Sequence, residues 1–456
     1  MPRKRKGDAI RVQLEYDLLS SDARAAIEES AANLLQSIDP AIQGDAVSEY
    51  RSRVWPALGR ASSYTTVDPH LVLLPLNRLG VPQGLSGSDV MVGYFVDRGA
   101  SQLSPSRPMV VKYGTVADGR DKLQEEKVAA ETLKQHVYVG HDHFAFPFRC
   151  DPATRQHRYS VLWSPFSTSQ TVTEVVRPSE LQLRYVKDLL HLLRGPQARV
   201  HGVEVLQKTY SLLEQLHRSG DPAGISVRRQ LYEEYAWYLR NVDRPDGWGQ
   251  QWREIWGRRR TASDFGTTWS NPFSVLKSIE NLPPAALSCG VIHGDLHPRN
   301  VILSASYDPF LIDYGWSQSD KHVAKDFALL ECNLRFVTLP PDVPNEHLLK
   351  MAGWLSMSDR MPGLGHATCT ARCQLIRVVR ESFRSLVRRP RVDAALHWIV
   401  EYEIPLFLVA FGLLQHIRDY DNQLAARMTV LSLATHLDAR LPELEQWLRG
   451  GRGAAA

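Results

Sequence analysis

The pattern of apolar and polar positions divides the chain into a strand-rich stretch followed by a longer helical one. Between residues 71 and 166, short apolar runs with a period near two predict strands, and one helical stretch, 121–137, lies among them. From about residue 180 onward, apolar residues recur at helical spacing, interrupted by a short strand-like stretch at 290–316. The pattern therefore predicts an α+β protein with a strand-rich part and a mainly helical part.

Two segments depart from this scheme. Residues 1–70 hold one short helical pattern, 21–37, and are predicted to form an N-terminal extension with a basic tail. A segment rich in tryptophan and arginine, about 218–271, breaks the helical pattern with several glycines and prolines and is interpreted as an insertion. We accordingly expect a strand-rich domain at 71–166 and a helical domain at 167–456.

Composition narrows the class of protein. A chain of 456 residues with 43% hydrophobic and 23% charged residues is long and apolar enough to fold, which excludes general disorder. The five cysteines are few and scattered, which favours a reducing, cytoplasmic compartment over a disulfide framework. The strongest apolar run, 404–414, is too short to cross a bilayer and is typical of a buried helix.

The residues best suited to catalysis or metal binding lie between positions 291 and 315. There the chain reads His-Gly-Asp-Leu-His-Pro-Arg-Asn, followed by two apolar runs around a turn and then Asp-Tyr-Gly. Asp295 and Asn300 precede this predicted hairpin and Asp313 follows it. Because the outer ends of an antiparallel pair lie on the same side, we expect the two carboxylates and the carboxamide to converge. Such hard oxygen ligands suit Mg²⁺.

This spacing matches what phosphoryl transfer requires. Asp295 would orient an acceptor hydroxyl, and Asn300 and Asp313 would hold Mg²⁺ on the phosphates of a nucleotide. The alternative is that both motifs are ordinary turn sequences. Several fixed residues at this spacing seldom arise together by chance, which favours the chemical interpretation.

The motif resembles the catalytic loop of the protein-kinase-like superfamily, in particular its aminoglycoside phosphotransferase and choline kinase branch, in which the loop runs His-Gly-Asp-x-His-x-x-Asn. The resemblance implies a bilobal kinase-like fold with a small β-rich N-lobe and a larger, mainly helical C-lobe that carries the insertion. Tyr314 stands where protein kinases usually have phenylalanine.

The resemblance also implies roles for single residues. Asp295 would be the catalytic base, and Asn300 and Asp313 the metal ligands. His293 would brace the catalytic loop, and Asp326 would correspond to the helix aspartate that ties this loop down.

A kinase-like protein also needs a lysine that binds the phosphates and a glutamate that pairs with it. Lys112 ends the apolar run Met109–Lys112 and is the candidate lysine. Of the glutamates on the next predicted helix, Glu126 shares a helical stripe with apolar residues, whereas Glu125 and Glu131 do not. A charge on an apolar stripe needs a counter-charge, which Lys112 supplies. The stripe consists of Leu123, Glu126, Ala130, Leu133 and Val137.

Two further segments are expected to touch the nucleotide. Residues 80–90 form a glycine- and serine-rich turn between predicted strands, whose backbone amides and hydroxyls suit phosphate oxygens. Residues 164–168 follow a strand and would form the hinge between the lobes, whose backbone would contact adenine. The residues assigned to nucleotide contact are Ser86, Gly87, Ser88, Ser164 and Phe166.

The predicted activity is transfer of the γ-phosphate of ATP or GTP, with Mg²⁺, to a hydroxyl of an unidentified small molecule or protein. The alternative is a catalytically silent nucleotide-binding regulator, a pseudokinase, in a bacterial signalling or defence system. The complete set of Lys112, Asp295, Asn300 and Asp313 disfavours that alternative. We expect no membrane or nucleic-acid partner, while the insertion or the extension offers room for a protein partner.

Two other patterns contain residue types that are common in functional sites. Asp264, Phe265 and Gly266 spell the metal motif of protein kinases, but no apolar strand precedes them and no role is assigned. Arginines at 377, 380, 384 and 388 recur at helical spacing and predict either a solvated helix face or a surface for an acidic partner or substrate.

Overall fold

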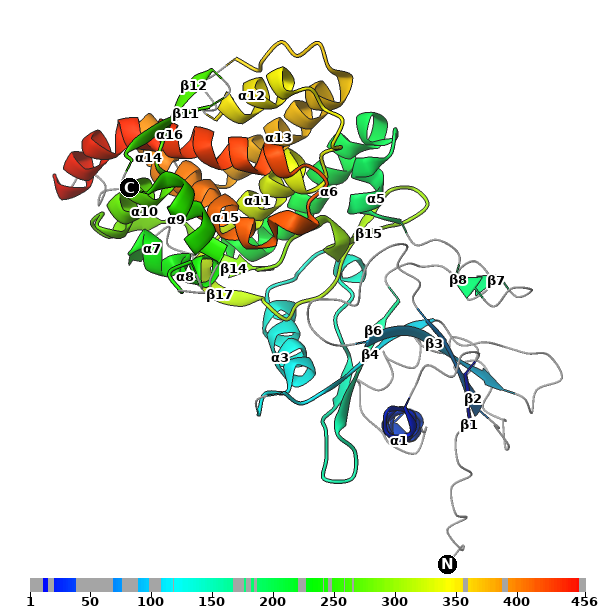
Figure 1. The fold of residues 1–456 in the computed structure, drawn as a ribbon. Coiled ribbons are helices and arrows are strands. Elements are labelled where there is room, and N and C mark those ends of the chain that lie inside the picture. Colours follow the sequence, from blue (N-terminus) through cyan, green and yellow to red (C-terminus); the bar gives the residue numbers. More distant parts are fainter. Residues whose placement is uncertain are drawn as a thin grey trace, which may run out of the picture. The chain divides into compact units, whose positions relative to one another are not determined.

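The computed structural model divides the chain into two compact units, here called the small unit and the large unit (Figure 1). The small unit comprises residues 1–134, 142–186 and 310–315, and the large unit comprises 135–141, 187–309 and 316–456. The structure describes residues 11–14, 20–37, 69–75, 89–97, 108–117, 119–166, 176–177, 182–183, 187–219, 227–240, 242–244, 248–257, 259–264, 266–355, 360–387 and 393–450.

The small unit is built on a six-stranded sheet in the order β1-β2-β3-β4-β6-β5. All neighbours in this sheet are antiparallel except β1 and β2, which run parallel. A short pair, β7 and β8, lies outside it. The strands are β1 (Arg11–Leu14), β2 (Pro69–Pro75), β3 (Asp89–Asp97), β4 (Met109–Thr115), β5 (Arg149–Asp151), β6 (Tyr159–Pro165), β7 (Val176–Arg177) and β8 (Gln182–Leu183).

Side chains alternate along β4, so one face of the sheet is apolar and the other carries Lys112. Met109, Val111 and Tyr113 point into an apolar core, so Lys112 points to the opposite face. On that face lies α3 (Lys122–Lys134), whose buried residues are Leu123, Glu126, Ala130 and Leu133. These are the inward-facing positions predicted for this helix from its sequence.

Helix α1 (Ser21–Ser37) covers the apolar face and shares its core. Its small and aliphatic residues, which include Ala26 and Ile27, pack there with Val111 and Trp163. The indole of Trp163 also donates a hydrogen bond to Ser30 Oγ, at 2.7 Å. Residues 1–70 were expected to form an extension, but this helix is part of the small unit, because its alanines allow close approach to the sheet.

The large unit is mainly helical, so the predicted α+β class is confirmed. Its short strands pair antiparallel, among them β14 with β17 and β15 with β9. The strands are β9 (Lys187–Asp188), β10 (Val227–Arg229), β11 (Thr261–Asp264), β12 (Thr267–Ser270), β13 (Ala285–Leu287), β14 (Cys289–Ile292), β15 (Val301–Leu303) and β17 (Gln318–His322), while β16 (Pro309–Leu311) begins the short return to the small unit. The helices are α5 (Leu189–Arg194), α6 (Ala198–Arg218), α7 (Leu231–Glu234), α8 (Ala236–Leu239), α9 (Trp248–Trp256), α10 (Pro272–Glu280), α11 (Ala324–Cys332), α12 (Asn345–Gly353), α13 (Ala367–Leu386), α14 (Ala394–Trp398), α15 (Ile404–Leu413) and α16 (Gln423–Arg449).

One helical stretch, Ala394–Asp419, is long and apolar enough by composition to cross a membrane. In the structure 83% of its apolar window is buried within the protein. Its central part, α15, packs against α11 and α16 in the core of the large unit. The stretch is therefore accounted for as a core helix, as the sequence predicted for residues 404–414.

The segment interpreted as an insertion supplies its own small core. Trp256 and Trp269 form an apolar cluster with Leu431 of α16, and Trp252 and Phe273 pack against it. The segment is thus folded onto the C-terminal helix of the large unit.

The arginines at helical spacing along α13 differ in their exposure. Arg380 is fully buried and pairs with Glu331 of α11, and Arg335 pairs with the same carboxylate. Arg377 is exposed and pairs with Glu381 on its own helix. Arg384 is exposed like Arg377, whereas Arg388 lies outside the described residues. The predicted polar face is therefore wrong at position 380, which lies on the apolar face of α13.

Candidate active site

In the small unit, Lys112 is held by two carboxylates. Its Nζ lies 2.7 Å from Glu126 Oε1 and 3.4 Å from Asp313 Oδ1. The side chains of Lys112 and Glu126 are only 13% and 8% exposed, whereas that of Asp313 is 38% exposed. The structure thus brings three of the predicted site residues together, with one carboxylate buried and the other open to solvent.

Burial and the two carboxylates set the charges of this group. Burial acts against the charge on Lys112, but Asp313 and Glu126 outweigh it and raise the pKa of the ammonium. Burial raises the pKa of Glu126 to about 7, although Lys112 pulls in the opposite direction. The lysine therefore stays positively charged, and the buried glutamate is easier to protonate than an exposed one.

The segment after β16 is fixed by contacts within the small unit. The amide of Ala145 donates to the carbonyl of Leu311, and the hydroxyl of Tyr314 donates to the same carbonyl at 2.5 Å. The ring of Tyr314 is fully buried and lies 5.0 Å from that of Phe146. Asp313 between them has a φ of 66°, a conformation that aspartate tolerates better than most residues. Tyrosine therefore fills the position after Asp313 as a buried anchor.

In the large unit, the loop that follows β14 is tied to Asp326 of α11. The backbone amides of His293 and Gly294 each donate to this carboxylate at 2.8 Å. His217 of α6 lies 3.0 Å from it through Nε2. Burial alone would raise the pKa of Asp326, but the bond from His217 and the other polar contacts lower it. An ionised, fully buried aspartate thus fixes the start of the loop.

Gly294 is required by the geometry of this loop. It has a φ of 81°, and a Cβ at this position would lie 2.1 Å from the carbonyl oxygen of Trp316. A side chain would therefore clash with backbone and would also occupy a left-handed conformation. This close approach places the backbone of Trp316 beside the residue that precedes Asp295.

Asp295 and Asn300 lie at the two ends of the same loop. The side-chain amide nitrogen of Asn300, Nδ2, donates a hydrogen bond to the backbone carbonyl of Asp295 at 2.9 Å. The same nitrogen lies 3.5 Å from the Asp295 carboxylate. Asn300 is buried, while the Asp295 side chain is 32% exposed and lies 3.6 Å from Nε2 of His297. The carboxylate of Asp295 therefore has Asn300 and His297 nearby and is still partly accessible to solvent. The convergence of Asp313 with these two residues stays a prediction.

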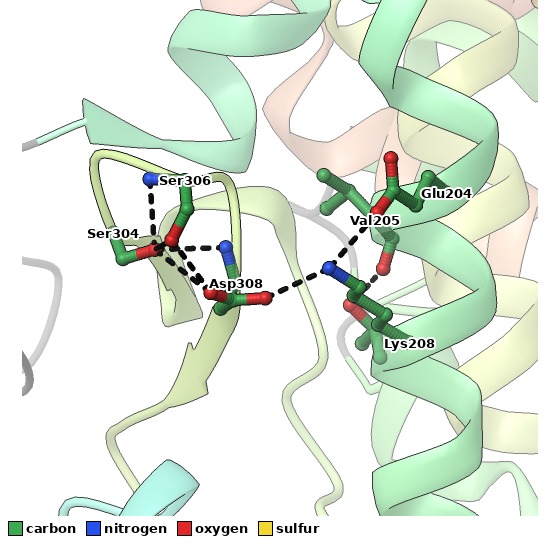
Figure 2. A network of polar contacts seen from close by, with 7 residues as sticks. Glu204, Val205, Lys208, Ser304, Ser306 and Asp308 are labelled. Atoms are coloured by element: carbon green, nitrogen blue, oxygen red, sulfur yellow. Dashed lines mark hydrogen bonds and ion pairs between the residues drawn. The ribbon is translucent and has the colours of Figure 1, made fainter.

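The turn after β15 is pinned to α6 by a polar network (Figure 2). Asp308 accepts a hydrogen bond from Ser306 at 2.7 Å, and its carboxylate pairs with Lys208 at 2.8 Å. Glu204, one turn earlier on α6, lies 2.9 Å from the same lysine. The network fixes the turn that precedes the Asp-Tyr-Gly segment.

The remaining predicted nucleotide contacts are placed only in part. Ser164 is buried in β6, where it pairs in register with Val110. The amide of Phe166 donates to the carbonyl of Pro108, so it is already used within the small unit. The glycine-rich turn with Ser86, Gly87 and Ser88 lies outside the described residues.

One residue that contacts Asp326, His217, is not predicted from the sequence. His217 lies on the buried face of α6 and completes the contacts of Asp326. A histidine on the apolar stripe of an amphipathic helix was the available signal, since a buried imidazole needs a polar partner.

Comparison with protein families assigns the chain to one family. The model of the family described as ternary complex associated domain 9 matches residues 194–432, just over half of the chain. The protein belongs to this family. The matched region contains the loop with Asp295 and Asn300 as well as the segment interpreted as an insertion. No curated protein is detectably similar in sequence.

Solved structures similar to this chain include phosphotransferases and a choline kinase. An aminoglycoside phosphotransferase from Alicyclobacillus acidocaldarius is 14% identical, with a TM-score of 0.36 over 79% of this chain and 90% of that one. Macrolide 2'-phosphotransferase from Brachybacterium faecium is 12% identical, with a TM-score of 0.36 over 86% and 97%. Choline kinase from Cryptosporidium parvum is 12% identical, with a TM-score of 0.33 over 89% and 96%.

Proposed function

We propose that this protein is a phosphotransferase that moves the γ-phosphate of ATP or GTP to a hydroxyl group of an acceptor. The observation that carries the proposal is the position of Lys112 Nζ, which lies 2.7 Å from a buried glutamate and 3.4 Å from an accessible aspartate. A purely structural lysine would not need a second carboxylate that is open to solvent.

On the donor side, Lys112 would bind the nucleotide phosphates, and Glu126 would keep its ammonium in place. Asp313 is the accessible carboxylate of this group and is suited to a metal ion. Because Glu126 is buried and Asp313 is not, the two carboxylates would divide the tasks of holding the lysine and holding the metal.

On the acceptor side, Asp295 would orient the hydroxyl and accept its proton as the bond to phosphorus forms. Its partial exposure leaves room for an acceptor, and Asp326 fixes the loop that carries it. Positioning of this kind supplies much of the rate in phosphoryl transfer, since the protein has little covalent chemistry to perform.

The donor atoms fit Mg²⁺. Asn300 uses its amide nitrogen toward Asp295, so its carbonyl oxygen is the atom suited to a metal. With the carboxylate of Asp313 it would give the mixture of carboxylate and amide oxygens that Mg²⁺ accepts beside nucleotide phosphates. When bound, the ion would neutralise charge on those phosphates.

The test is transfer of ³²P from [γ-³²P]ATP, with Mg²⁺, to water and to a panel of hydroxyl compounds. We expect wild type to release or transfer labelled phosphate and Asp295→Asn and Asp313→Asn to lose at least a hundredfold in rate. Asp342→Asn, on an exposed residue, is the control and should retain full activity. Undiminished turnover in either site variant would refute the mechanism.

The same experiment separates this proposal from the silent regulator. A thermal shift with Mg-ATP reports binding in both cases. A wild-type protein that is stabilised by Mg-ATP but releases no phosphate with any acceptor would be a nucleotide-binding regulator.

A further inference from the structure

Two exposed tryptophans form a pair on the surface of the large unit. The side chains of Trp237, on α8, and Trp316, before β17, are 43% and 45% exposed, and their ring centroids lie 4.8 Å apart. Within the part of the chain that the structure describes, they are the tryptophans among the exposed large hydrophobic residues. Two large aromatic side chains that are exposed and in contact offer a flat apolar surface to a ligand.

The pair lies beside the candidate catalytic base. The backbone carbonyl oxygen of Trp316 packs against Gly294, the residue before Asp295. It lies so close that a Cβ on residue 294 would be only 2.1 Å from it. Tyr238 packs edge-on against Trp237, with ring centroids 5.2 Å apart. Burial raises the pKa of Tyr238, and the charge of Asp295 raises it further, which agrees with a carboxylate close to this aromatic group.

A positive charge completes the pair. The guanidinium of Arg240 lies 4.0 Å from the ring centroid of Trp237. Arg240 is exposed, so its guanidinium N–H groups can donate hydrogen bonds to an anionic group. A cationic ligand would meet this fixed charge, whereas a neutral or anionic ring would find two aromatic faces and a guanidinium.

We infer that Trp237, Trp316 and Arg240 form the acceptor subsite, and that the acceptor is a ring-bearing hydroxyl compound that is neutral or anionic. This inference rests on the proposed phosphotransferase function and narrows its substrate class. The rings bind the carbon-rich face of the acceptor, and Arg240 binds an acidic substituent where one is present. The like charge of the same arginine disfavours polycationic acceptors.

The test measures acceptor binding directly. Phenyl β-D-glucoside and phenyl β-D-glucuronide are matched probes, one neutral and one anionic, and kanamycin is the polycationic probe. Saturation-transfer NMR titrations of the full chain with Mg²⁺ give the dissociation constants. We expect both phenyl glycosides to bind, the glucuronide more tightly, and kanamycin to show no binding.

Variants then assign the contacts. Trp237→Ala and Trp316→Ala should each raise the dissociation constants of both phenyl glycosides about tenfold, which is the effect of losing one stacking contact. Trp237→Phe should recover part of this loss, and Arg240→Ala should remove only the preference for the glucuronide. Ile255→Ala and Arg199→Ala, on exposed residues elsewhere in the large unit, are the controls and should bind as wild type does.

Phosphate release from Mg-ATP, measured in parallel, separates the two proposals. Glycoside binding that depends on the tryptophans, in a protein without turnover, supports a binding site for ring-bearing compounds but refutes the proposed function and with it the role of an acceptor. Turnover in a wild type that binds neither glycoside overturns the subsite alone. Unchanged affinity in both tryptophan variants, or tighter binding of kanamycin than of the glucuronide, also overturns it.

Discussion

Glu126 is a charged residue at a position where the pattern of its helix calls for an apolar one. The helical stripe on which it lies is otherwise apolar, and the structure buries it against Lys112. Glu125, the preceding residue, is exposed and pairs with Arg120. Adjacent glutamates on one helix thus have different environments, which provides a matched pair for mutagenesis.

We predict that Glu126→Gln lowers kcat/KM for ATP at least tenfold, because Lys112 loses the partner that fixes its ammonium. Glu125→Gln should change kcat/KM less than twofold, since exposed ion pairs contribute little. Steady-state kinetics with varied Mg-ATP give the comparison. Equal effects in the two variants would show that Glu126 has no special role toward the nucleotide.

This pairing could be predicted from sequence because it depends on local periodicity and on one rule about buried charge. The arginine pattern of α13 shows the limit of the same reasoning. Four arginines at helical spacing predict a polar face, yet Arg380 lies among buried residues because Glu331, far away in sequence, neutralises it. Spacing locates a face of a helix, but only tertiary contacts decide whether a charged face is solvated.

Among the elements, α1 was foreseen as a helix but not as part of a core. Its alanine-rich face has little hydrophobic contrast, so the sequence does not show which surface it covers. The sequence predicts the loop with Asp295 and Asn300 more fully, because its motif is contiguous and its anchor, Asp326, follows at a short distance in sequence. His217 was missed because its contact with Asp326 joins elements far apart along the chain.

We predict that Ile27→Ala destabilises the protein by about 2–4 kcal/mol, the usual loss for a fully buried aliphatic side chain. Glu29→Ala, on the exposed side of the same helix, should cost less than about 1 kcal/mol. Urea unfolding gives the free energies, and hydrogen exchange of β6 reports whether the sheet beneath the helix opens. A neutral Ile27→Ala would mean that α1 does not pack on the sheet in solution.

At the scale of the whole molecule, a buried ionic cluster links α11 to α13 and to the segment before α15. Glu331 pairs with Arg335 and Arg380, and it accepts a hydrogen bond from Tyr402 at 2.6 Å. Burial would raise the pKa of Glu331, but the two arginines lower it to about 2. The carboxylate is thus ionised in the folded protein over nearly the whole acid range.

The sign of the resulting pH dependence follows from this depressed pKa. The stabilisation is fully present above the ordinary glutamate pKa of about 4.5 and is lost as the pH falls toward 2, for a total of roughly 3 kcal/mol. We predict that Tyr402→Phe raises the pKa of Glu331 and moves the acid unfolding midpoint upward. Glu381→Gln, an exposed member of α13, should leave the midpoint unchanged. Acid titrations followed by circular dichroism give both midpoints, and coincident curves for wild type and Tyr402→Phe would contradict the prediction.

The chain leaves the small unit after residue 186 and returns to it only at 310–315, the segment that carries Asp313. A fragment that ends at residue 186 would contain Lys112 and Glu126 but would lack the second carboxylate. During synthesis on the ribosome, the small unit likewise stays incomplete until nearly half of the large unit has been translated. The order in which the chain is made thus delays assembly of the lysine–carboxylate group until the loop with Asp295 has also emerged.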